Sequence, residues 1–170
     1  QLTKAPLREM GTLTFEKSLE GALKTSTYII ESLPENLQLK HNLYKEIEQI
    51  SNNSIILSST SGFKPTDLQK YMKNPQSLLV THPFNPVYLM PLVELVPGQE
   101  RDQNIVDDVH HLLEYVGMAP IIIKKEIDAF VADRMLEAMW REALWLIKDD
   151  ICTTKELDDI ITSSFGLRFA

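Results

Sequence analysis

Short runs of branched apolar residues alternate along the chain with longer segments in which apolar residues recur every three or four positions. The runs predict strands over residues 27–30, 54–58, 77–81, 92–96 and 119–124. Several of these runs are continuously apolar rather than alternating, which is typical of strands buried on both faces of a sheet.

Helical spacing fills the intervals between the predicted strands. Residues 37–50 place an apolar residue at every third or fourth position and predict one helix. Pro65 opens a short predicted helix over 65–72, and Gly117 ends another over 103–116 as a C-cap. Strands that alternate with helices predict an α/β layer structure with a largely parallel sheet.

The pattern changes after about Asp128. Residues 129–149, rich in Met, Leu, Ala and Trp, predict one long helix without a strand partner, and Thr153 is a candidate N-cap for a second helix through Ile161. We therefore expect an α/β domain over residues 1–126 and the start of an all-helical domain over 127–170. Two helices rarely bury a core alone, so the helical part should lean on the α/β domain or on a partner chain.

Composition and charge exclude several classes of function. The formal net charge of −7 disfavours non-specific nucleic-acid binding, which needs clustered Lys and Arg. Cys152 is the only cysteine, so no disulfide within the chain is possible, and a reducing cytoplasm is the expected location. No apolar stretch is long enough for a membrane span, and no secretory signal is expected at the N-terminus. Because the chain does not begin with Met, Gln1 need not be the biological start.

Three residues in or just after predicted strands are candidates for chemistry. Ser61 and His82 follow strands of an open α/β sheet, where ligands usually bind. His82 lies just before Pro83, in a loop stiffened by prolines, which suits a group that transfers protons near neutral pH. Glu94 lies within an apolar strand, where an ionised carboxylate is costly unless it is paired, and His82 is its natural partner.

Each candidate also has an ordinary alternative. A single His in a loop is commonly a structural hydrogen-bonding residue. His110 and His111 are adjacent on a predicted helix and point in different directions, so no metal site is expected there. Cys152 follows two aspartates, which would raise the pKa of its thiol, so we expect it to be inert.

Three segments together resemble a known family. They are Ser58-Ser59-Thr60-Ser61, His82-Pro83-Phe84-Asn85-Pro86 and Leu92-Val93-Glu94. They resemble the L-3-hydroxyacyl-CoA dehydrogenase superfamily over residues 14–170, and with Phe165-Gly166-Leu167-Arg168 they look most like its bacterial L-carnitine dehydrogenases. The resemblance implies the second half of a Rossmann-type, doubly wound sheet, an NAD cofactor, a small-molecule substrate and a homodimer formed through the helical part.

The resemblance also implies roles for individual residues. His82 is similar to the family's catalytic base, Glu94 to the acid that orients it, and Ser61 to the serine that contacts the reacting oxygen. Asn85, Glu35 and Lys40 are similar to residues that border the cofactor. The ordinary alternative for Glu35 and Lys40 is a helix start with two solvated charges.

Two departures from the family pattern matter. No spacing among the six glycines makes a Gly-x-Gly-x-x-Gly loop, so we expect these 170 residues alone to be inactive and to bind NAD weakly. Asp133 stands where the acyl-CoA enzymes carry Asn, which suits a cationic substrate better. Aromatic side chains attract a quaternary ammonium, and Phe165 or Phe169 are the candidates to do so, whereas Trp140 and Trp145 suit a core or a subunit interface.

Three functions remain open from the sequence. The first is an NAD-dependent dehydrogenase of L-carnitine. The second is an L-3-hydroxyacyl-CoA or L-gulonate type dehydrogenase. The third is a non-catalytic structural or dimerisation module, which the missing glycine loop would favour and the intact Ser61, His82 and Glu94 set would not.

Overall fold

The computed structural model describes residues 11–51 and 53–169 and divides the chain into two compact units, Gln1–Phe130 and Val131–Ala170. The division falls just after Phe130, whose side chain is buried in the core of the first unit. The change of pattern in the sequence lies slightly earlier, at residues 126–128.

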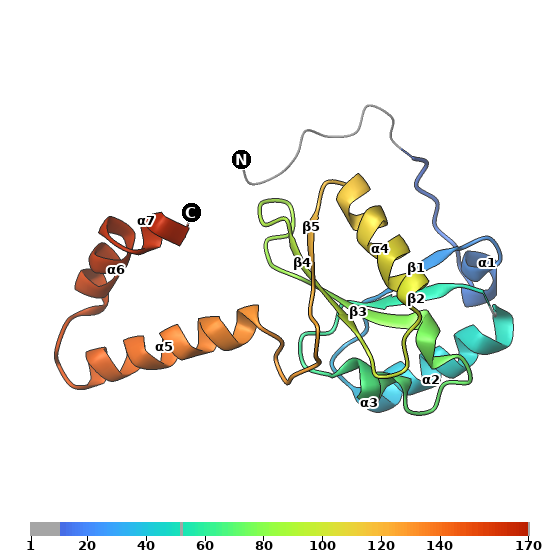
Figure 1. Cartoon of the computed structure of the whole chain (residues 1–170), viewed down its shortest axis with the longest axis horizontal. Helices are drawn as coiled ribbons and strands as arrows, with labels where there is room; N and C mark the ends of the chain where they lie inside the picture. The colour runs from blue at the N-terminus through green and yellow to red at the C-terminus, as the bar shows by residue number, and fades with distance from the viewer. Residues whose placement is uncertain (1–10, 52, 170) are drawn as a thin grey trace. The chain divides into compact units, whose positions relative to one another are not determined.

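The first unit contains a five-stranded sheet in the order β1-β2-β3-β4-β5 (Figure 1). The strands are β1 (Tyr28–Glu31), β2 (Ile55–Ser58), β3 (Leu78–Pro83), β4 (Leu92–Pro97) and β5 (Ala119–Ile122). Neighbours pair in parallel except for β3 and β4, which are antiparallel. The predicted α/β fold with a mostly parallel sheet is confirmed. The one antiparallel pair arises because the loop from 84 to 91 is too short for the crossover that parallel strands need.

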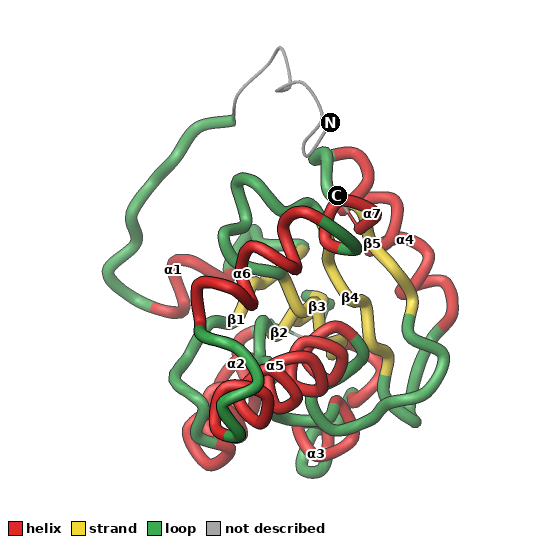
Figure 2. The backbone as a smooth tube through the Cα atoms, turned by 90° about the vertical axis from the view of Figure 1, so that its left-hand side faces the viewer, coloured by secondary structure: helices red, strands yellow, loops and turns green. Residues whose placement is uncertain are grey.

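Helices cover both faces of the sheet (Figures 1 and 2). Helices α1 (Leu19–Leu23), α2 (Leu37–Ile50) and α3 (Pro65–Gln69) contribute to a core with alternate strand residues such as Ile56 and Val80. Helix α4 (Gln103–Tyr115) packs on the other face against Leu57, Leu79 and Leu95. This two-sided burial explains the continuously apolar strand runs.

The helix boundaries follow local capping. Helix α2 has the predicted bounds, and the Asn36 side chain accepts a hydrogen bond from the backbone N–H of Leu39 at its start. Helix α3 ends earlier than predicted, and α1 and a 3₁₀ turn (Pro75–Ser77) were not predicted. Elements this short carry too few positions for a periodic pattern to identify them.

The second unit consists of α5 (Ala132–Lys148), α6 (Thr154–Ser163) and α7 (Gly166–Phe169). The predicted N-cap at Thr153 is confirmed, as part of a capping box with Glu156. The prediction that the long helix begins at residue 129 was wrong. Ala129 and Phe130 have φ angles of 57° and 47°, in the left-handed region, so a right-handed helix begins only after them. None of the described helices has both the length and the apolar character needed to cross a membrane.

Candidate active site

A buried His–Glu pair joins β3 to β4. Nδ1 of His82 lies 2.9 Å from Oε2 of Glu94, and the two residues are direct partners in the antiparallel register. Their exposed fractions are 5% and 2%. The contact that the sequence suggested is therefore present. His82 was predicted to lie in a loop after the strand, but it lies within β3. The antiparallel return of β4 places Glu94 directly opposite it.

Strand alternation brings further polar side chains to the same face of the sheet. Glu31 pairs with Ser58 across β1 and β2, and His82 pairs with Glu94 across β3 and β4. Because side chains two residues apart point to one face, His82 lies on the same face as Val80, toward α2 and α3. Glu31, Ser58 and His82 come at or near the carboxyl ends of parallel strands, the usual place for a ligand in an open α/β sheet.

Aromatic residues surround the imidazole. The ring centroid of Phe130 lies 5.2 Å from that of His82, and the centroid of Phe84 lies 5.9 Å from it in an edge-to-face arrangement. Phe130 is buried although its φ is positive, so its packing must offset a backbone conformation that L-residues rarely adopt. Phe130 was not predicted as a site residue, because no sequence signal points to its contact with His82.

A second buried network centres on Glu31, which was also not predicted as a site residue. Lys40 Nζ lies 2.8 Å from Glu31 Oε1, and the hydroxyls of Tyr44 and Ser58 donate to Oε2 at 2.7 and 2.6 Å. Burial alone would raise the pKa of Glu31, but the hydrogen bonds from Lys40, Ser58 and Tyr44 and from the Leu33 backbone outweigh it and hold the pKa below its usual value. Glu31 could have been found from the sequence, because it ends the apolar run Tyr28-Ile29-Ile30. As for Glu94, a carboxylate in an apolar strand needs a buried partner.

Glu35 connects two loops at the same edge of the sheet. Its carboxylate accepts hydrogen bonds from the Thr60 hydroxyl at 2.7 Å and from the backbone N–H of Ser61 at 2.8 Å. A longer bond of 3.4 Å comes from the N–H of Gly62. The loop after β1 is therefore tied to the loop after β2, which carries Ser61.

The structure places the other predicted site residues in different surroundings. Ser61 and Asn85 are exposed in loops that follow β2 and β3. Lys40 is 1% exposed and paired with Glu31, so the alternative of a solvated lysine is wrong for this residue, whereas the Glu35 side chain is 42% exposed. Asp133 and Phe165 lie in the second unit, in the first turn of α5 and beside an apolar cavity. The Phe169 side chain lies outside the described residues.

The network around Glu31 makes acid stability a test of its ionisation. The pKa of Glu31 is lower in the folded state than in the unfolded state, where it is about 4.5. Such a carboxylate stabilises the fold at every pH above 4.5, and this contribution is lost as the pH falls through the folded-state pKa. We expect Glu31→Gln to lower stability at pH 7 and to show a smaller further loss than the wild type on acidification below pH 4.5. Urea unfolding from pH 6 to pH 3 measures both effects. Equal pH slopes for the two proteins would contradict the assignment.

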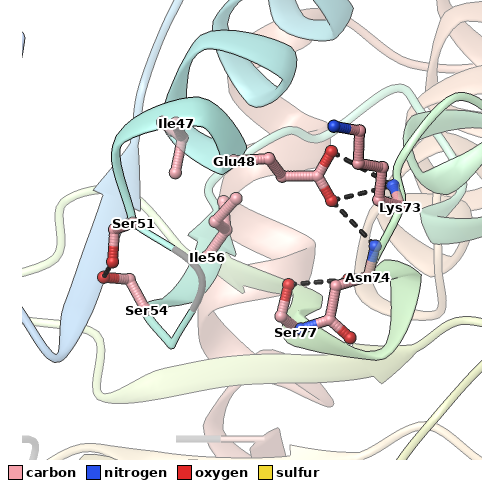
Figure 3. Close-up of a pocket in the computed structure, with 8 residues that line it drawn as sticks. All are labelled: Ile47, Glu48, Ser51, Ser54, Ile56, Lys73, Asn74 and Ser77. Atoms are coloured by element: carbon pink, nitrogen blue, oxygen red, sulfur yellow. Dashed lines mark hydrogen bonds between the residues drawn. The ribbon is translucent and has the colours of Figure 1, made fainter.

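A cavity of about 340 Å³ lies at the opposite edge of the sheet (Figure 3). It is lined by residues at the end of α2, before β2 and before β3, which include Ser54 and Ser77. The Glu48 carboxylate accepts hydrogen bonds there from the backbone N–H groups of Lys73 and Asn74. Because His82 and Glu31 lie at the carboxyl ends of β3 and β1, this cavity is not part of their site.

Two family models match the chain in succession. Residues 3–127 match the model described as 3-hydroxyacyl-CoA dehydrogenase, NAD binding domain, and residues 130–170 match the C-terminal domain of the same family. The chain therefore belongs to the 3-hydroxyacyl-CoA dehydrogenase family, as the sequence resemblance indicated.

Within the family, the chain is similar over nearly its whole length to two L-carnitine dehydrogenases. The chain is 51% identical to an L-carnitine dehydrogenase of Mesorhizobium japonicum over 100% of its own length and 47% of the relative's. It is also 51% identical to the L-carnitine dehydrogenase of Oceanobacillus iheyensis, over 94% of this chain and 52% of that protein. The chain spans about half the length of these relatives.

Solved structures show the same fold. A 5-formyl-3-hydroxy-2-methylpyridine 4-carboxylic acid 5-dehydrogenase, described as an NAD⁺-dependent dismutase, superposes with a TM-score of 0.89 at 28% identity, over 96% of this chain and 53% of the other. The (S)-3-hydroxybutyryl-CoA dehydrogenase of Ralstonia eutropha gives a TM-score of 0.76 at 31% identity, over 82% of this chain and 50% of that one.

Proposed function

We propose that the protein is an NAD-dependent dehydrogenase that oxidises the 3-hydroxyl of L-carnitine to the ketone. The observation that carries this proposal is the buried pair of His82 and Glu94 at the carboxyl end of β3. The two L-carnitine dehydrogenases at 51% identity support the substrate. A purely structural module has no physical need for a carboxylate buried against an imidazole, since an apolar pair would fill the same volume at lower cost.

His82 and Glu94 would together accept the proton of the substrate hydroxyl. In a neutral imidazole, a proton on Nδ1 that is donated to Glu94 leaves Nε2 as the acceptor. Nε2 of His82 takes the proton of the substrate hydroxyl, and the Glu94 carboxylate stabilises the imidazolium that results. Ser61 would donate a hydrogen bond to the oxygen as it becomes a carbonyl.

The loops at this edge fit a nicotinamide cofactor in part. Bound NAD would supply the acceptor for the hydride that leaves the hydroxyl-bearing carbon. Ser61 and Asn85 are exposed and Glu35 is partly exposed, so all three are available to a ligand. Lys40 does not fit a direct contact in this arrangement, because its ammonium is buried between Glu31 and the Leu33 carbonyl. The loop that usually binds the pyrophosphate of NAD has the sequence Gly-x-Gly-x-x-Gly, and this chain does not contain it.

The assay that tests the function compares substrates. NADH formation at 340 nm should be faster with L-carnitine than with 3-hydroxybutyryl-CoA, with kcat/KM at least about tenfold higher, equivalent to one good polar contact. Preference for the acyl-CoA would instead favour an L-3-hydroxyacyl-CoA dehydrogenase. Failure with both substrates, in a protein that contains the complete cofactor site, would favour a non-catalytic role.

Asp133 tests the idea of charge complementarity in the second unit. Its carboxylate lies in the first turn of α5, and we propose that it favours a substrate with a quaternary ammonium. Asp133→Asn should raise KM for L-carnitine about 5- to 30-fold, as expected for an ionic contact of ~1–2 kcal/mol, and should change kcat less. Asp149→Asn, at the C-cap that follows α5, serves as the control. Unchanged turnover in Asp133→Asn at limiting L-carnitine would rule the idea out.

We also propose that the helical part forms a homodimer and that the enzyme is cytoplasmic. Helices α5 and α6 contain no buried residue, and a cavity of about 690 Å³ between them is lined by apolar side chains such as Met139, Leu146 and Phe165. Trp140 and Trp145 are also exposed, and they line a separate hollow on α5 together with Leu144. Surfaces of this kind are normally covered by another domain or subunit. Sedimentation of the active enzyme measures its oligomeric state.

A further inference from the structure

The carboxylate of Glu31 is buried and is held by four groups of the described residues. It accepts hydrogen bonds from Lys40, Tyr44 and Ser58 and also from the backbone N–H of Leu33 at 2.6 Å. Burying an ion pair of this kind costs desolvation energy, and an apolar core would be as stable or more so. The network must therefore be explained by what it holds in place.

The contacts continue from Glu31 to the loop that carries Ser61. Lys40 donates to the Leu33 carbonyl at 3.1 Å, and Glu31 accepts from the Leu33 N–H. Both backbone polar groups of Leu33 are therefore fixed. Leu33 lies two residues before Glu35, and the Lys40 ammonium lies 4.0 Å from Oε2 of Glu35. Glu35 in turn accepts from Thr60 and from the Ser61 N–H.

The loop at the far end of this series begins at Ser59, whose N–H donates a hydrogen bond to the Glu31 carbonyl and whose hydroxyl donates to that of Ser32. Within it, the Thr60 hydroxyl accepts hydrogen bonds from the N–H groups of Gly62 and Phe63. Thr60 itself is buried, whereas Ser61 and Gly62 are exposed. Ser61 itself is held through its N–H, which donates to the Glu35 carboxylate. Glu35 lies in the loop that Glu31 and Lys40 fix at Leu33.

We propose that Glu31 is a positioning residue: through Lys40 and Leu33 it sets the position of Glu35, which fixes the Ser61 loop for the reaction. This inference rests on the proposed function for its consequence in catalysis. Its structural part, that the Ser61 loop depends on Glu31, stands without that function.

Amide hydrogen exchange tests the structural part directly. In Glu31→Gln the carboxamide cannot balance the Lys40 charge, and we expect exchange at the Ser61 and Gly62 amides to rise about tenfold, as for the loss of one hydrogen bond. If Glu31→Gln fails to fold, the double variant Glu31→Gln/Lys40→Met takes its place, because it also removes the unpaired Lys40 cation. We expect the same rise in exchange at residues 61 and 62 in the double variant. Glu48→Gln is the matched control, since its carboxylate also holds a loop, at Lys73 and Asn74, on the opposite edge.

Turnover tests the catalytic part. In the active enzyme we expect kcat of the Glu31 variant to fall by up to about 100-fold, the cost of misplacing a contact by ~1 Å, with KM for L-carnitine within about threefold of the wild type. Glu48→Gln should leave kcat unchanged and raise exchange only at residues 73–74. Unchanged exchange at residues 61–62 overturns the proposal, and so does an unchanged kcat when exchange is faster. If the wild type does not oxidise L-carnitine, the proposed function fails while the exchange experiment still decides whether Glu31 positions the loop.

Discussion

Replacing His82 by Gln should lower kcat for L-carnitine oxidation by about 10²–10⁴-fold, the usual contribution of a positioned general base. Gln is close to His in size and can still donate to Glu94, so the β3–β4 pairing should persist. It cannot accept a proton, and the substrate hydroxyl would have to lose its proton to water. Stopped-flow or steady-state NADH formation measures the effect.

The control for His82→Gln is a histidine without a place in the site. His110→Gln, on the face of α4 beside Glu114, should leave kcat within twofold of the wild type, since surface changes of this kind perturb stability by no more than about 0.5 kcal/mol. A His82→Gln enzyme that retains more than one tenth of wild-type kcat would show that another group removes the proton.

Replacing Glu94 by Gln should also lower kcat strongly, by about 10³–10⁴-fold, if the carboxylate acts as the orienting acid of a triad does. The amide can present its NH₂ group to Nδ1, which favours the other tautomer and places the proton on Nε2. The imidazolium formed in the reaction would also lose its counter-ion. Glu94→Asp, which keeps the charge but shortens the reach, should recover part of the activity.

The two substitutions should not be additive. Because the residues act as a unit, a His82→Gln/Glu94→Gln enzyme should be about as slow as the slower single variant. The kcat values of the two single variants and the double variant measure this coupling. Multiplicative losses would mean that the two residues act independently, despite the 2.9 Å contact between them.

The sequence predicted the parts of the fold that depend on periodic burial. The five strands and the helices α2 and α4 follow from apolar runs and apolar spacing, and α6 follows from the capping chemistry at Thr153. Strand direction was harder to predict, because an apolar run such as Leu92-Val93 has the same pattern in either direction. The loop of residues 84–91 was the only signal for the antiparallel return.

The sequence also predicted the contact between His82 and Glu94, because a carboxylate in an apolar strand requires a partner. The same argument applies to Glu31, which lies at the end of a strand and pairs with Lys40 nine residues later. Phe130 could not be found in this way. Its contact with His82 depends on two left-handed residues at the end of the first unit, and no local pattern specifies them.

The tautomer of His82 is the most direct test of the central claim, because it can be measured without substrate or cofactor. Long-range ¹H–¹⁵N NMR of the neutral ring distinguishes a protonated ring nitrogen from an unprotonated one. We predict a protonated Nδ1, which donates to Glu94, and an unprotonated Nε2, which can accept the substrate proton. The reverse pattern, with the proton on Nε2, would contradict the role of Glu94 as the residue that prepares His82 to act as a base.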